Sequence, residues 1–77
     1  MEQKINTNNR ITIYPKIMLG KPIITGTRIP IYVILNLLGE GYTNNEIIKE
    51  YPDLTKEDIL SAIKFASKFT EFNEIDA

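Results

Sequence analysis

Apolar side chains dominate the middle of the chain, where they follow a helical pattern. Pro30 suits a first helical turn, and Gly41 suits the left-handed conformation that follows a last turn. The pattern predicts a helix over residues 31 to 40. Its apolar positions surround almost the whole helical wheel: Ile31, Val33, Ile34, Leu35, Leu37 and Leu38. A helix with this distribution is buried on most sides.

A polar cluster after this helix has the signature of a second helix start. Thr43 and Glu46 have the spacing of a capping box, in which the hydroxyl and the carboxylate each accept from a backbone amide of the other residue. Pro52 disfavours helical geometry in the residue before it, so we expect this helix to end before Tyr51.

The same spacing recurs twelve residues later and predicts a third helix. Thr55 and Asp58 repeat the cap, with aspartate in place of the preferred glutamate. The helix continues to about residue 69, which makes it the longest of the three. Three apolar residues at helical spacing predict its inward face: Ile59, Ile63 and Ala66.

Two short β patterns precede the helices. Residues 11 to 14 alternate apolar and polar side chains before Pro15, and residues 22 to 25 form a second run between Gly20 and Gly26. The predicted fold is mainly α: a tri-helical, helix-turn-helix-like core, homeodomain-like or winged-helix-like, preceded by two short β-strands. We expect a flexible N-terminus over residues 1–9, a single domain over 10–70 and a C-terminal tail over 71–77.

Composition narrows the range of functions. The 77 residues are 43% apolar and 25% charged, which indicates one small domain. The absence of cysteine and histidine removes thiolate metal sites and the usual general base, so we predict no metal, no cofactor and no enzymatic activity. The alternative is an enzyme that uses Glu46 and Glu50 as paired carboxylates on one helix face. No apolar run is long enough for a membrane span, and we expect a cytoplasmic protein.

Charge is divided unevenly along the chain. Residues 1 to 38 hold five basic groups and one acid, whereas residues 39 to 77 hold four lysines and nine acids. The basic half is suited to face phosphates while the acidic half is repelled by them, which would orient the domain on nucleic acid. Attraction between the two halves within a folded monomer or dimer explains the same division, and both interpretations remain open.

The third helix carries a polar stripe that is a candidate for DNA contact. Its members are Glu57, Ser61, Lys64 and Lys68. Ser61 and Lys64 are placed to reach base edges, and Lys68 is placed to meet a phosphate. The alternative is structural, because acids in a first turn and lysines in a last turn also complement the helix dipole.

The segment from Gly20 to Pro30 is the richest in turn signals. Two glycines enclose the second strand, and Arg28 stands before the proline that opens the first helix, which predicts a tight loop with one conformation. Arg28 has three candidate partners: a carboxylate of the acidic half, a phosphate or a partner protein, of which a structural ion pair is the commonest. With Lys21, Arg28 is the main candidate for contact with a DNA backbone.

The same segment resembles a known family. The motif Gly-Lys-Pro-x-Ile-x-Gly-Thr-Arg-Ile-Pro is followed by an apolar helix, a Gly-x-Thr-x-x-Glu-Ile turn, Tyr-Pro-x-Leu-Thr and Asp-Ile-x-x-Ala-Ile. Together these resemble the prokaryotic domain of unknown function four-three-three, from residue 11 to about residue 66. The resemblance implies a helix-turn-helix-like antitoxin, encoded beside a PIN-like ribonuclease toxin, that forms a homodimer and binds operator DNA. It implies no residue-level site.

The C-terminal tail adds a candidate surface for such a partner. Three apolar residues recur every third position: Phe69, Phe72 and Ile75. One interpretation is that they dock on the core or across the dimer. The other is that they form an amphipathic helix that fills a groove on the toxin.

We therefore predict an antitoxin that binds operator DNA and a PIN-like toxin. The alternative is a protein-interaction module that masks a partner without binding DNA. The sequence pI near 5.3 favours this alternative, because dedicated DNA-binding domains are usually basic.

Overall fold

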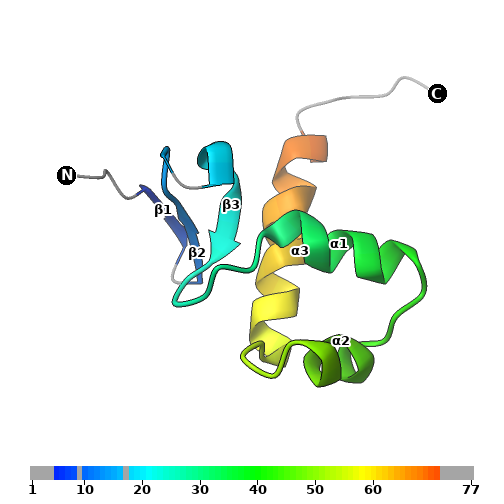
Figure 1. Cartoon of the computed structure of the whole chain (residues 1–77). Coiled ribbons are helices and arrows are strands. Elements are labelled where there is room, and N and C mark those ends of the chain that lie inside the picture. Colours follow the sequence, from blue (N-terminus) through cyan, green and yellow to red (C-terminus); the bar gives the residue numbers. More distant parts are fainter. Residues whose placement is uncertain (1–4, 9, 17, 72–77) are drawn as a thin grey trace.

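The computed structural model describes residues 5–8, 10–16 and 18–71, and it confirms a mainly helical fold in which three helices follow short strands. Figure 1 shows a small sheet on one side of the helices. The elements in chain order are β1 (Ile5–Asn8), β2 (Ile11–Ile13), the short 3-10 helix η1 (Met18–Gly20), β3 (Pro22–Ile24), α1 (Ile31–Gly39), α2 (Asn44–Glu50) and α3 (Lys56–Glu71). We refer to residues 5–29 as the sheet part and to residues 31–71 as the helical part.

The sheet has three antiparallel strands in the order β1-β2-β3. Ile11 pairs with Ile24 at the β2–β3 ladder, and an isolated bridge joins Ile23 to Pro30 beyond it. β2 and β3 are the two strands that the sequence predicts. β1 is an addition, because it lies within residues 1–9, whose asparagine-rich sequence gives no strand signal.

The core is made almost entirely of branched aliphatic side chains from both parts. Of the residues whose burial the structure describes, nine apolar ones are buried: Ile11, Ile23, Ile24, Ile31, Ile34, Ile47, Leu54, Ile59 and Ala62. On α1, Ile31 and Ile34 are buried and four further apolar residues are half-buried, which confirms that this helix is covered on most sides. α1 packs on β3, α2 and α3, so it links the sheet part to the other two helices.

Both predicted caps are present. The Thr43 amide donates to Glu46 Oε1 at 2.8 Å, and the Glu46 amide donates to Thr43 Oγ1 at 3.1 Å. At α3, the Thr55 amide donates to Asp58 Oδ2 at 3.0 Å and the Asp58 amide to Thr55 Oγ1 at 3.2 Å, so aspartate completes the box in the same way. Gly41 has a φ of 97°, the left-handed conformation that the sequence predicts after α1.

The inward face of α3 differs from the prediction in one residue. Ile59 is buried and Ala66 is half-buried as expected, but Ile63 is 42% exposed and Ala62 takes the central core position. Ile63 lies about 100° round the helix from Ala62, outside the strip that the core covers. Leu60 is also 54% exposed. α3 therefore presents two large apolar side chains to solvent, which its sequence spacing alone did not reveal.

Among the described residues, no helix has the length and apolar content that a membrane span requires.

Candidate functional site

The loop between β3 and α1 is fixed by a closed set of hydrogen bonds around Thr27. The Thr27 amide and its hydroxyl both donate to the Ile24 carbonyl, at 3.0 and 2.8 Å. The Ile29 amide donates to Thr27 Oγ1 at 3.0 Å, and the Ile24 amide donates to the Ile29 carbonyl at 3.0 Å. Gly26 has a φ of 83°, which is the value that the third position of a type II turn needs. Thr27 thus takes part in three of these four hydrogen bonds, and Gly26 supplies the left-handed residue of the turn.

This loop presents Arg28 to solvent. Arg28 is exposed beside an open hollow of about 320 Å³, whose other lining residues are Tyr14, Ile23, Gly26 and Thr27. Within residues 5–8, 10–16 and 18–71, no ion pair involves Arg28. The loop therefore presents an exposed guanidinium next to the Tyr14 side chain.

A structural ion pair is formed by Arg10 and not by Arg28, for which the sequence left an ion pair, a phosphate and a partner protein open. Arg10 Nη1 lies 3.0 Å from Asp58 Oδ1, and Asp58 is buried while its other oxygen caps α3. Arg10 stands in the turn before β2, and its carbonyl accepts from the Thr25 amide at 2.8 Å. This turn therefore joins the β3–α1 loop to the first turn of α3.

Lys21 lies at the other end of β3 from Arg28. Its Nζ is 4.9 Å from the centroid of the Tyr32 ring on α1, within the range of a cation–π contact. Both residues line an almost wholly apolar groove of about 230 Å³, with Pro22, Ile31, Leu35, Phe65 and Ala66. Lys21 is thus a rim residue of an apolar groove, and it does not share the hollow of Arg28.

The predicted stripe of α3 is accessible but mixed in chemistry. Lys64 and Lys68 are exposed and Ser61 is half-buried. The exposed surface of the same helix includes Leu60 and Ile63. The α3 residues that line the Lys21 groove are Phe65 and Ala66, so neither lysine of the stripe takes part in it.

The predicted partner-binding tail lies largely outside the described residues. Phe72 and Ile75 belong to residues 72–77, which the structure does not describe. The backbone of Phe69 continues α3, but its side chain is also outside the description.

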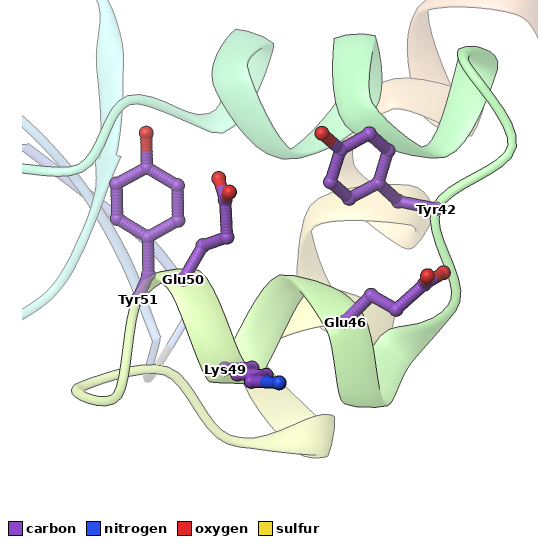
Figure 2. Close-up of a pocket in the computed structure, with 5 residues that line it drawn as sticks. All are labelled: Tyr42, Glu46, Lys49, Glu50 and Tyr51. Carbon is purple, nitrogen blue, oxygen red and sulfur yellow. The ribbon is translucent and has the colours of Figure 1, made fainter.

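A third hollow runs along α2, and two of its residues, Glu46 and Glu50, are the paired carboxylates of the alternative enzymatic prediction. It is lined by Tyr42, Glu46, Lys49, Glu50 and Tyr51 (Figure 2). The signal that the sequence offered is a tyrosine at each end of a short acidic helix. In the described part of the chain, no group of three or more metal-ligating residues occurs.

The comparisons with known proteins identify the family. The family described as "Protein of unknown function (DUF433)" matches residues 11–66, so the chain belongs to it and the predicted resemblance is confirmed. The chain is also similar to the "Uncharacterized protein y4eO" of Sinorhizobium fredii (strain NBRC 101917 / NGR234), with 29% identity over 65 residues. That match covers 84% of this chain and 28% of the relative, so the chain spans under a third of that protein's length. No solved structure matches significantly.

Proposed function

We propose that this protein is a non-enzymatic antitoxin that binds DNA through the Arg28 loop and binds a PIN-like ribonuclease toxin. The observation that carries the DNA-binding part is the exposed side chain of Arg28, which stands on a loop whose backbone is fixed by the Thr27 hydrogen bonds and forms no ion pair among the described residues. An arginine binds a phosphate through two parallel hydrogen bonds, and a loop backbone that is already ordered loses little freedom on binding. The sheet part supports this function, because residues 5–29 hold four basic side chains and no acid.

A gel-shift titration with the DNA upstream of the protein's own gene tests this proposal. We expect Arg28→Ala to weaken binding on all DNA sequences alike and to lower the slope of log affinity against log salt by about 0.9. Lys49→Ala is the matched control, since it removes one exposed positive charge from α2. Circular dichroism must show that both variants are folded.

Two outcomes contradict the DNA-binding part. If Arg28→Ala binds DNA with the same affinity as the control Lys49→Ala, the loop has no contact with DNA. If Arg28→Ala loses binding to one operator only, the side chain reads bases, and its assignment to a phosphate is wrong. Lys21→Ala, Lys64→Ala and Lys68→Ala extend the same titration to the other predicted contacts.

A second candidate is an interaction module that masks a partner protein without binding DNA. The observation that favours it is the exposure of Leu60 and Ile63 on α3, the helix that would have to enter a DNA groove. Exposed apolar side chains on one helix are typical of a protein interface, either with the toxin or across the homodimer that we also propose. An unshifted operator together with toxin neutralisation would establish this candidate.

The toxin-binding part is tested by truncation after Glu71, which leaves α3 intact. Co-expression with the neighbouring toxin gene shows whether residues 72–77 are needed for neutralisation, and light scattering shows whether the truncated chain remains a dimer. A folded dimer that no longer neutralises supports docking of Phe72 and Ile75 on the toxin. A truncated chain that still neutralises removes the tail from the interface.

A further inference from the structure

We propose that the hollow along α2 binds an arginine side chain of a partner protein, with Glu50 as the counter-ion and the rings of Tyr42 and Tyr51 as its walls. Figure 2 shows these three side chains pointing into the same space beneath α1. This inference concerns a surface that the proposed DNA contact does not use. It holds whether or not the partner is a toxin.

The hollow is built from the two ends of one short helix. Tyr42 precedes the cap of α2, and Tyr51 is its C-terminal capping residue, so both rings are placed by the helix boundaries. Both tyrosines are half-buried and pack against the core, which restricts the movement of their side chains. The walls of the hollow are therefore already in position before a ligand arrives.

The acidic group between these rings is available to a ligand. Glu50 is exposed, and in the described part of the chain it forms no ion pair. Glu46 is different, because its carboxylate accepts from the Thr43 amide and belongs to the cap. In Figure 2, Glu46 and Lys49 point away from the space that Glu50 and the tyrosines share. Of the two carboxylates that line the hollow, Glu50 is thus the one that takes no part in the cap and points toward the tyrosines.

The chemistry of these groups selects a guanidinium. Its planar fork binds a carboxylate through two parallel hydrogen bonds, and its face stacks on aromatic rings. A lysine ammonium offers neither the flat face nor the fork, so the hollow favours arginine. The excess of acids on the helical part, seven against four lysines over residues 31–71, further attracts a basic partner surface.

The test is an NMR titration of the isotope-labelled full chain with the peptide acetyl-Gly-Arg-Gly-amide. Two control peptides carry citrulline, which has the same shape without the charge, or lysine, which has the charge without the fork. We expect saturable shifts of the Tyr42, Glu50 and Tyr51 amide resonances with the arginine peptide, at a dissociation constant on the order of ten millimolar. The lysine peptide should bind at least about threefold more weakly, and the citrulline peptide should give no saturable shift.

Variants locate the binding in the hollow. Glu50→Gln should weaken the arginine peptide at least about threefold, because it removes the counter-ion and retains the shape. Glu57→Gln is the matched control: it removes one exposed negative charge from α3 and should leave the affinity unchanged. Tyr51→Leu tests the aromatic wall, with Tyr51→Phe as the variant that keeps the ring and the packing. Loss of affinity in Tyr51→Leu and retention in Tyr51→Phe support stacking.

Three results would overturn the proposal: equal shifts from the arginine and citrulline peptides, equal affinity for arginine and lysine, or an unchanged affinity in Glu50→Gln. Each is measured on a folded chain and without DNA or toxin. Failure of this proposal therefore leaves the gel-shift test of Arg28 unaffected, and the converse also holds.

Discussion

The sheet part and the helical part of this protein differ in both charge and construction. Residues 5–29 contain no acid, whereas residues 31–71 contain seven acids. The helical part is held by an aliphatic core and by caps whose partners are three residues apart. The sheet part has three short strands and a loop that depends on Thr27. The difference in charge is the basis of our two proposals, which place an anion at Arg28 in the sheet part and a cation at Glu50 in the helical part.

Among the described residues, an ion pair joins the sheet part to the helical part. It is formed by Arg10 with Asp58, and it crosses from the sheet part to α3. Charge attraction between the halves of the chain is thus concentrated at this pair. The exposed groups Arg28 and Glu50 lie outside it and remain available to external partners.

The Arg10–Asp58 ion pair is the junction between the two parts, and breaking it should have the largest effect on the free energy of unfolding. We expect Asp58→Ala to lower the free energy of unfolding by about 2 kcal/mol, because it breaks the ion pair with Arg10 and leaves the Thr55 amide without its acceptor, while the Thr55 hydroxyl still caps α3. Arg10→Ala should cost about half as much, since the Arg10 side chain is 44% exposed and solvent screens the pair. Urea denaturation of both variants and of the double variant measures the coupling. If each variant loses under about 0.5 kcal/mol, the junction does not join the two parts energetically.

The junction also marks the limit of sequence-based prediction for this fold. The caps at Thr43 and Thr55 and the left-handed Gly41 were predictable, because each depends on residues within one helical turn. The pairing of Arg10 with Asp58 spans 48 positions, and no local signal connects them. β1 was missed for a similar reason, since its pairing with β2 stabilises a segment that has no strand pattern of its own.

The candidate sites divide in the same way. The turn signals predicted a fixed loop around Arg28, and the structure shows how Thr27 fixes it. An ion pair of Arg28 within the chain depends on which carboxylates the fold brings near it. The sequence does not give these positions, so it left the partner of Arg28 open. The α2 hollow was missed, because Tyr42 and Tyr51 flank a helix and tyrosines in such positions usually serve packing.

The second prediction concerns the loop of the sheet part. We expect Thr27→Val to lower the free energy of unfolding by about 1.5 kcal/mol, because it removes two hydrogen bonds of the hydroxyl and leaves the Ile29 amide unsatisfied. Thr27→Ser keeps the hydroxyl and is the matched control. Thermal unfolding followed by circular dichroism compares the three chains. Equal stability of Thr27→Val and Thr27→Ser would show that the hydroxyl does not determine the loop.

The third prediction concerns the helical part and uses the same type of change. Thr43→Ala should cost about 1 kcal/mol, because the capping box of α2 is exposed and water partly replaces its hydrogen bonds. Thr43→Ser should remain within a few tenths of the parent value, as serine caps equally well. A loss larger than that of Thr27→Val would reverse the comparison and make the helical part the more dependent on a single hydroxyl.

The smallest expected effect is at the groove where the two parts share an apolar surface. Lys21 lies over the Tyr32 ring, and both residues are exposed, so the cation–π contact should contribute about 0.5 kcal/mol. A double-mutant cycle with Lys21→Gln and Tyr32→Leu isolates this term, because leucine keeps the groove apolar while removing the ring. If the coupling has this size, Lys21 must give up the contact with the Tyr32 ring before it meets a phosphate. We therefore expect Lys21→Ala to lower the DNA affinity less than Arg28→Ala does. A coupling indistinguishable from zero, together with equal effects of Lys21→Ala and Arg28→Ala on DNA affinity, would show instead that both ends of β3 present free cations to the same ligand.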